Sequence, residues 1–445
     1  MGIKDKTMKS IRVSIIATVA TVMALGTTGC AAQKSTTATQ NDSAASSSSV
    51  QSKDVSAQYD KGFIAFYHER DYATALRIFS DLAHKGDAAS QTFLGYIYAE
   101  GRGVEKDPTK AMEWYLKADG QGDYEAPTFI GHLYKDGAGV DRDYAAAMKW
   151  YRKGDDLGDD GAPTAIGDLY ALGDGVAQDC GEAMKWYRKG AAREDDYALY
   201  NIAWLYDSGY GVERDFGEAM KWYKLSSDLG NPNAPTAIGY MYEVGDGVEK
   251  DVSEALKWYK IAVERGDDQG TYNLGNFYAD GIGVKQDYAE AMRLFRLADQ
   301  NGSTDAPTAI GWLYAGGYGV STDYAEALKW YRKAIDRSQE PQAQNNLGLM
   351  YEDGQGVTRD LSEAKRLYET AAKQGNTDAQ YNLGRLLKDG RGTTQDLVEA
   401  YKWFALVEKQ TNSQKAREKL DVLAALMSSA EIAEAKRLAE NWQAE

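Results

Sequence analysis

The sequence predicts an all-α solenoid built from about ten helix-turn-helix repeats. The stretch 94–114 returns eight further times along the chain, and the interval between copies is 36 residues except for one of 37. Each copy holds two segments with helical spacing of apolar residues, separated by Gly-x-Gly-Val, or Gly-x-Gly-Thr in the last copy. A fixed period of this length is typical of supersecondary units that stack on one another.

Residues 1–29 have the composition of an export signal. Four basic residues precede an uncharged, mostly apolar run over 13–25, which is short for a membrane span. The run ends in Thr-Thr-Gly-Cys at 27–30, which resembles the processing site of a bacterial lipoprotein, although that family usually has Leu where Thr27 stands. The resemblance implies that Cys30 becomes the lipidated first residue of a protein in the cell envelope, either periplasmic or surface-exposed. Secretion after plain cleavage, or an uncleaved N-terminal anchor, stays an alternative.

Residues 30–52 are rich in Ser, Thr, Ala and Gln and have almost no large apolar side chain. Such a segment buries too little surface to offset the entropy of ordering, so we expect a disordered tether. Residues 53–88 follow as an atypical first repeat, in which Asp71 and Ala75 keep the period but the Gly-x-Gly-Val turn is missing. A terminal repeat is expected to be atypical because one of its faces meets solvent.

Nine regular repeats fill residues 89–410. The first helix of each carries a small residue that should let a neighbouring helix come close. The Gly-x-Gly turn then ends this helix, because glycine takes a positive φ without strain. An aspartate follows in all nine copies and is expected to cap the second helix. Seven copies add a glutamate three residues later, which resembles a capping box with Asp in place of Ser or Thr.

Residues 411–445 are expected to form two closing helices, over 411–427 and 428–442. Ser428 and Glu431 have the capping-box spacing at the start of the second one. We expect these helices to cover the apolar face that the last repeat leaves open.

The spacing and residue types of the nine copies resemble the Sel1-like repeat, a relative of the tetratricopeptide repeat with a longer loop between its helices. The resemblance covers residues 89–410 and implies a right-handed α/α superhelix of antiparallel helix pairs, with 53–88 as a tetratricopeptide-like cap. It also implies use as an adaptor or scaffold. The family supplies no catalytic motif.

The sequence shows no pattern typical of catalysis or metal binding. Its three histidines are scattered, and its two cysteines, Cys30 and Cys180, cannot form a disulfide framework. Gly-x-Ser-x-Gly, His-Glu-x-x-His and the P-loop do not occur in it. We therefore expect no enzyme, no metal and no cofactor. The net charge of −16 argues against nucleic acid as the principal partner, because phosphate binding needs a basic surface.

Two positions of the first helix vary between repeats. One, here called the variable position, directly follows the small residue; the other, the threonine position, lies four residues earlier and holds Thr, Tyr or Asn. By resemblance to tetratricopeptide units, both should face the concave groove, although some of the side chains could instead pack on the adjacent repeat. The residues that we expect to bind a partner there are Tyr96, His132, Asp168, Tyr200, Trp204, Tyr240, Tyr272, Asn276, Trp312, Tyr381 and Arg385.

Tyr, Trp and Arg dominate binding hot spots, so these positions suit the capture of a partner. The sequence thus predicts a non-enzymatic scaffold, anchored in the envelope, that binds a protein or peptide in its groove. A binder of envelope polysaccharide or peptidoglycan fragments is the alternative, because the same aromatic rings can stack on sugars. An envelope hydrolase is a remote third candidate, since no catalytic constellation supports it.

Overall fold

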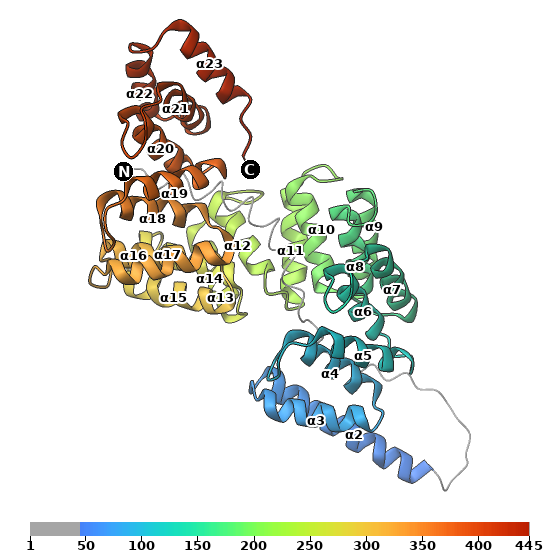
Figure 1. Ribbon diagram of the computed structural model, residues 1–445. Helices are drawn as coiled ribbons and strands as arrows, with labels where there is room; N and C mark the ends of the chain where they lie inside the picture. The colour runs from blue at the N-terminus through green and yellow to red at the C-terminus, as the bar shows by residue number, and fades with distance from the viewer. Residues whose placement is uncertain (1–44, 445) are drawn as a thin grey trace. The chain divides into compact units, whose positions relative to one another are not determined.

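The computed structural model describes residues 45–444, with side chains described from residue 54. Within this range the chain forms 22 helices and no strand, which confirms the all-α class (Figure 1). The expected export signal, Cys30 and the tether up to residue 44 lie outside the described residues. Among the described residues, no helix has both the length and the apolar character needed to cross a membrane.

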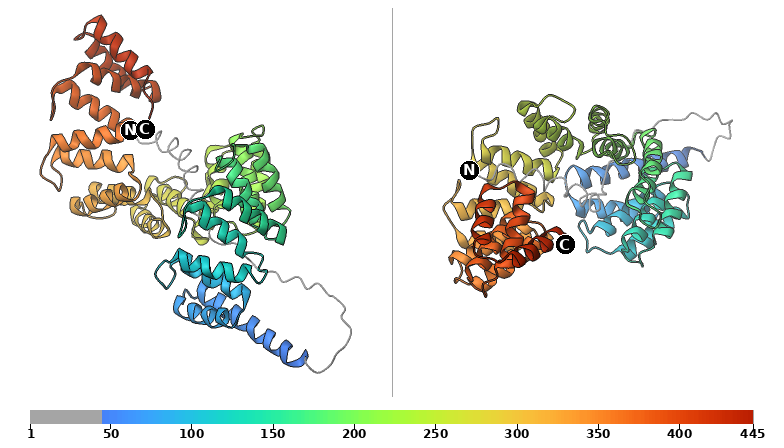
Figure 2. Two further views of the ribbon diagram at one scale, coloured as in Figure 1. Left: turned by 45° about the vertical axis from the view of Figure 1, so that its right-hand side comes forward. Right: turned by 90° about the horizontal axis from the view of Figure 1, so that it is seen from above.

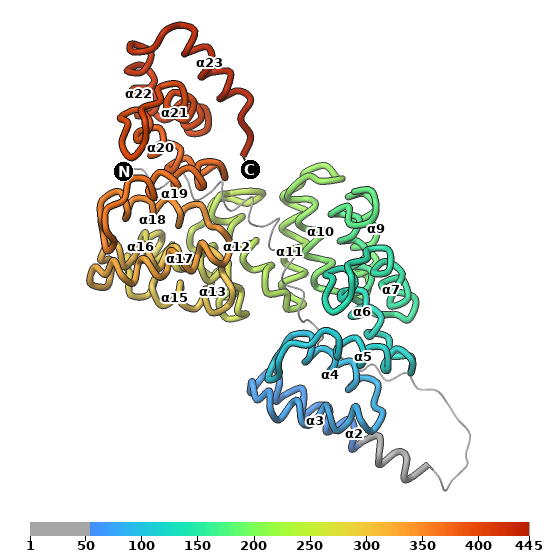
Figure 3. Tube along the Cα trace, in the orientation of Figure 1, coloured from blue at the N-terminus to red at the C-terminus, as the bar shows by residue number. Residues whose placement is uncertain are grey.

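Each of the nine regular repeats is a pair of helices, which Figure 3 traces along the chain. The first helices are α4 (Ala88–Glu100), α6 (Ala126–Asp136), α8 (Ala162–Leu172), α10 (Asp196–Ser208), α12 (Ala234–Val244), α14 (Asp268–Asp280), α16 (Ala306–Gly316), α18 (Pro341–Asp353) and α20 (Thr377–Asp389). The second helices are α5 (Pro108–Asp119), α7 (Tyr144–Leu157), α9 (Cys180–Ala191), α11 (Phe216–Asp228), α13 (Val252–Glu264), α15 (Tyr288–Asn301), α17 (Tyr324–Ser338), α19 (Leu361–Lys373) and α21 (Leu397–Thr411). The additional helices are α2 (Ala45–Tyr67), α3 (Tyr72–His84), α22 (Gln414–Ala424) and α23 (Ser429–Glu440).

The chain divides into two compact units, 1–234 and 235–445. In the first unit, each helix from α2 to α10 packs against the helix that follows it in sequence. The second unit repeats this arrangement from α13 to α20, and α22 and α23 both pack on α21. Within each unit the helix pairs therefore stack in series, as an α/α solenoid does (Figure 2).

Helix α2 runs from Ala45 to Tyr67, so it takes in the last residues of the expected tether and the first part of the atypical repeat. The later part of α2 is held by aromatic packing, for example by Phe66 on Phe93 of α4, at a ring-centroid distance of 5.2 Å. Residues 45–52 contain neither Gly nor Pro. Extending an existing helix through them costs less than nucleating a new one.

Two glycines end the first helix of each repeat, for different reasons. Gly173 has φ +78° and closes α8 in the left-handed conformation, with its amide bonded to the Leu169 carbonyl. Gly175 has φ +71°, and a Cβ there would lie 2.4 Å from Cβ of Tyr144, the first residue of the preceding repeat's second helix. The second glycine thus lets the turn of one repeat lie directly on the repeat before it.

The aspartate after the turn caps the second helix in all nine regular repeats, as expected. In α9, Asp179 accepts a hydrogen bond from the Glu182 amide at 2.9 Å. The capping-box expectation is wrong, because the Glu182 side chain pairs with Lys185 instead. The Asp179 amide already donates to the Tyr170 carbonyl at 2.9 Å, so the glutamate has no free amide to bind.

The last closing helix, α23, differs from the second helices of the repeats because it has a true capping box. Ser428 and Glu431 form a complete capping box at the start of α23, which confirms that expectation. Leu423 of α22 and Ala435 of α23 belong to the same buried cluster as Phe404 of α21. The two helices therefore extend the core beyond the last repeat.

In eight of the nine regular repeats, the small residue of the first helix is a glycine that faces an aromatic ring of its own second helix, 20 residues later in the sequence; the fourth repeat has Ala203 there. A Cβ added at Gly167 would lie 2.5 Å from Cε1 of Tyr187, a side chain that is 3 % exposed. Glycine inside a helix costs about 1 kcal/mol relative to alanine. The repeat accepts this cost because the ring occupies the space that a methyl group would need.

Candidate functional site

Two residues at the variable position hydrogen-bond to this same ring. The hydroxyl of Tyr151 lies 2.8 Å from Nδ1 of His132, and the hydroxyl of Tyr187 donates to Asp168 at 2.8 Å. Asp168 also accepts from Asn201 of the next repeat at 3.1 Å. Burial lowers the pKa of His132 to about 3 and raises the pKa of Asp168 to about 6. Both side chains are therefore engaged in hydrogen bonds inside the solenoid, His132 within its own repeat and Asp168 also with the next repeat.

Tyr96 and Arg385, at the two ends of the series, are also engaged inside the fold. Tyr96 is 5 % exposed and packs edge-on against the rings of Phe66 and Phe93. Both terminal nitrogens of Arg385 bind the carboxylate of Glu352, at 2.7 and 2.5 Å, and Glu352 is 4 % exposed. Such a bidentate pair holds the guanidinium in place.

The threonine position joins each repeat to the next one. Where the residue is threonine, its hydroxyl donates to a carboxylate just ahead of, or at the start of, the next repeat's first helix, as Thr128 does to Asp159 at 2.5 Å. The same bond links Thr92 to Asp123, Thr164 to Asp195, Thr236 to Asp267 and Thr308 to Glu340. The threonines were expected to line the groove, and the structure instead gives them a role in stacking.

Where the threonine position holds tyrosine, the ring packs on the aromatic residue of its own second helix. The ring centroids are 5.3 Å apart for Tyr200 and Tyr223, 5.5 Å for Tyr272 and Phe295, and 5.3 Å for Tyr381 and Phe404. Tyr200, Tyr272 and Tyr381 are half-buried, as are Tyr240 and Asn276 at the variable position. Each of these side chains therefore keeps part of its surface in solvent.

The two tryptophans at the variable position form aromatic pairs with the turn. Trp204 lies 5.5 Å from Tyr210, and Trp312 lies 4.5 Å from Tyr318, measured between ring centroids. Both tyrosines occupy the middle of the Gly-x-Gly turn, six residues after the tryptophan. Tyr210 is 50 % exposed and Tyr318 is 36 % exposed. Each unit thus presents one Trp–Tyr pair to solvent.

These two tyrosines are not among the binding residues predicted from the sequence. The signal was present, because the middle residue of Gly-x-Gly varies between copies and is tyrosine only in the two copies that carry tryptophan at the variable position. In these two copies, the side chains at the variable position and in the middle of the turn form one surface.

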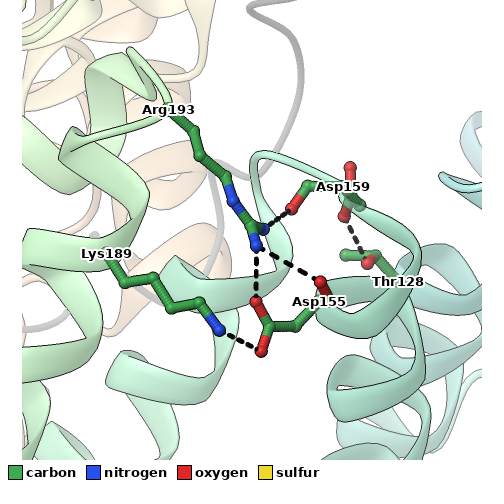
Figure 4. A network of polar contacts seen from close by, with 5 residues as sticks. All are labelled: Thr128, Asp155, Asp159, Lys189 and Arg193. Atoms are coloured by element: carbon green, nitrogen blue, oxygen red, sulfur yellow. Dashed lines mark hydrogen bonds and ion pairs between the residues drawn. The ribbon is translucent and has the colours of Figure 1, made fainter.

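Buried ionic contacts lie at the junctions between repeats (Figure 4). Asp155 of α7 is 7 % exposed and binds Lys189 and Arg193 of the next repeat, at 2.6 and 3.0 Å. Arg193 also donates to the Asp159 carbonyl at 2.6 Å. Burial raises the pKa of Asp159 to about 6, against the opposing effect of its hydrogen bond with Thr128. These contacts join neighbouring repeats, and the charged groups that they pair are not available for catalysis.

Carboxylates with raised pKa values are candidates for proton transfer, so their partners matter. Burial raises the pKa of Asp267 to about 7, yet its Oδ2 accepts from the Thr236 hydroxyl at 2.5 Å and the Gly270 amide at 2.6 Å. Glu340 is held in the same way by Thr308 and by the amide of Gln342. In both cases the carboxylate caps a helix and ties two repeats together.

Nothing in the described range assembles a metal site, since no group of three His, Cys, Asp or Glu side chains is suitably placed. The thiol of Cys180 lies at the start of α9, where burial and the nearby Asp179 raise its pKa. A raised pKa disfavours the reactive thiolate. The geometry suits recognition by side-chain surfaces better than it suits catalysis.

Comparisons with known proteins agree with this architecture. A family model described as Sel1 repeat matches nine segments, at residues 88–123, 128–159, 164–195, 196–231, 236–267, 269–303, 307–338, 341–376 and 377–406. Among curated proteins, none matches the chain.

Two solved structures illustrate the likeness. A protective antigen of uropathogenic Escherichia coli strains, described as displaying an SLR fold, is 29 % identical over 88 % of this chain and 85 % of its own, with a TM-score of 0.59. A Sel1 repeat protein from Oxalobacter formigenes is 32 % identical over 56 % of this chain and 99 % of its own, with a TM-score of 0.49. Sel1 repeat proteins generally mediate protein–protein interactions and are generally non-catalytic. With nine matched repeats arranged as stacked helix pairs, the chain belongs to the Sel1 repeat family.

Proposed function

We propose that this protein is a non-enzymatic scaffold that binds a protein or peptide through the surface formed by the variable position and the middle of the turn. The observation that carries the proposal is the pair of Trp204 and Tyr210, whose rings lie 5.5 Å apart with Tyr210 half in solvent. The pair of Trp312 and Tyr318 repeats this arrangement in the second unit.

Two physical arguments support a binding role for these pairs. Exposing an aromatic ring forgoes the free energy of burying it, roughly 25 cal/mol per Å2 of apolar surface. The rings that face the small residue of the first helix avoid this cost, since Tyr187 and Tyr151 are almost fully buried. Exposed Trp and Tyr are also the residue types that contribute most to interfaces, because they add large contact area with few rotatable bonds.

Site-specific photo-crosslinking in cells that make the protein tests the proposal. A photoreactive amino acid replaces Tyr210 in one variant and Leu225 in the control. Leu225 is 49 % exposed and lies on the second helix α11, away from the turn. We expect a discrete protein adduct at position 210, none at 225, and loss of the adduct when Trp204→Ala is added. Equal adducts at both positions, or an adduct that survives Trp204→Ala, would contradict the proposal.

We further propose that the chain is exported and anchored in a bacterial envelope through lipid on Cys30. The support is the N-terminal sequence alone: basic residues, the apolar run 13–25 and a cysteine after it. Incorporation of a labelled fatty acid, lost in Cys30→Ser but kept in Cys180→Ser, is the expected result. Labelling of Cys30→Ser at the original level would refute the anchor without bearing on the scaffold.

A further inference from the structure

An open pocket of about 550 Å3 lies on the second unit, where the turn between α14 and α15 meets the turn after α16. Its lining residues are Tyr278, Val284, Lys285, Gln286, Asp287, Tyr288, Ala289 and Gly319. The volume is within the range of about 300–1,000 Å3 that is usual for ligand sites. None of these lining residues belongs to the variable or the threonine position, although the pocket adjoins the Trp–Tyr pair of this unit.

Tyr288 connects the pocket to the exposed aromatic pair of this unit. Its ring stacks on Tyr318, with centroids 5.1 Å apart and an interplanar angle of 29°. Trp312 completes the group, at 4.5 Å from Tyr318 and 6.3 Å from Tyr288. Three aromatic rings therefore continue from the wall of the pocket to the solvent.

Two features hold these rings in place. The side-chain amide of Gln286 donates to the Tyr288 hydroxyl at 2.9 Å and to the Ala279 carbonyl at 2.7 Å, which fixes the orientation of Tyr288. A Cβ at Gly316 would lie only 2.0 Å from the ring of Tyr318. Glycine at 316 leaves room for that ring, and no other copy of the repeat has glycine at the equivalent position.

We propose that this pocket binds a neutral saccharide, with a pyranose ring stacked on Tyr288, which Tyr318 supports, and its hydroxyls bonded to the polar residues of the rim. The aliphatic face of a pyranose carries C–H groups that suit the electron-rich face of an aromatic ring. The exposed rim supplies Lys285 as a donor, and the side-chain oxygens of Gln286 and Asp287 as acceptors. Sugar hydroxyls, which both donate and accept, can use all three.

Other ligand classes fit the lining less well. Lys285 is the single cation among the lining residues and Asp287 stands two positions away, so a phosphate or other anion gains little there. A wholly apolar ligand would shield the polar side chains of the rim from water without bonding to them. A proline-rich peptide can dock on aromatic rings, but proline has no backbone donor for Asp287. The saccharide satisfies both the rings and the rim.

Calorimetric titration of the full chain with chitotetraose, with cellotetraose and with a decaproline peptide tests the inference. We expect at least one tetrasaccharide to bind, and Tyr288→Ala and Tyr318→Ala each to weaken its affinity about five- to ten-fold. Gly316→Ala should weaken binding similarly while leaving the melting temperature unchanged or raised. The added methyl group displaces only an exposed ring, and alanine favours helix more than glycine does.

Tyr210→Ala is the matched control. Tyr210 occupies the same position of the Gly-x-Gly turn in the other unit and is 50 % exposed, but Cys180 stands there in place of Tyr288. We expect this variant to keep full saccharide affinity, so loss of protein crosslinking and loss of saccharide binding are separable. Absence of binding by both tetrasaccharides up to about 10 mM would overturn the inference. So would binding that Tyr288→Ala and Tyr318→Ala leave unchanged, or decaproline binding that these variants abolish.

Discussion

Replacing Gly167 with alanine tests whether the small residue exists to admit the ring of the second helix. The new Cβ would lie 2.5 Å from Cε1 of Tyr187, whereas carbon atoms in contact prefer about 3.5–4.0 Å. The ring must therefore move by about 1 Å in a core where Tyr187 is 3 % exposed. That displacement would also stretch its 2.8 Å hydrogen bond to Asp168.

The expected loss follows from three contributions. Overpacking a core costs about 1–3 kcal/mol. Weakening the hydrogen bond adds about 0.5–1.5 kcal/mol, and the better helix propensity of alanine returns about 1 kcal/mol. We expect Gly167→Ala to lower the free energy of unfolding by about 1–3 kcal/mol, measured as a lower midpoint of urea unfolding followed by circular dichroism.

Gly120→Ala is the control for this measurement. Gly120 has φ −61°, and a Cβ there would make only ordinary contacts, the nearest at 3.4 Å. We expect that variant to be as stable as the native chain or slightly more so. Adding Tyr187→Leu should cost less in the Gly167→Ala background than alone, since the smaller side chain relieves the clash. A Gly167→Ala protein that unfolds at the native urea concentration or above would refute the reasoning.

Three further outcomes follow from the caps and the buried titratable groups. Asp215→Ala removes the bond to the Glu218 amide and should cost about 1 kcal/mol, whereas Asp215→Asn should stay near native in the same urea assay. Burial raises the pKa of Asp267 to about 7, so between the usual aspartate pKa of about 3.9 and pH 7 the folded chain binds a proton that the unfolded chain has released. The free energy of unfolding should therefore fall as pH rises toward 7. In thermal melts, the Asp267→Asn variant should show a smaller fall over this range. Burial lowers the pKa of His132 to about 3, so the contribution of neutral His132 to folding stability is complete above about pH 6.5 and is lost as pH falls. If the melting temperature of His132→Gln drops as steeply between pH 6 and 4 as that of the native chain, His132 is not the cause of the drop.

Much of the candidate site could not be predicted from the sequence, and particular residues show why. Asp168 varies between repeats as a binding residue would, yet it is buried against Tyr187 and Asn201, the second of which lies 33 residues away. The capping box of Glu182 fails because the amide that it needs is bound to a carbonyl nine residues earlier. Both outcomes depend on contacts beyond the helix in which the pattern was found.

The repeat, the helix pairs, the left-handed glycine turn and the aspartate cap could be predicted from the amino-acid sequence, because these features depend on backbone geometry within a few residues. Which variable side chains are buried and which reach solvent could be learned from the three-dimensional packing alone. That outcome depends on how closely one repeat lies on the next, which glycines such as Gly175 and junction bonds such as that of Thr128 control. Trp204 and Trp312 therefore keep exposed aromatic pairs, while Tyr96 at the same position belongs to the core.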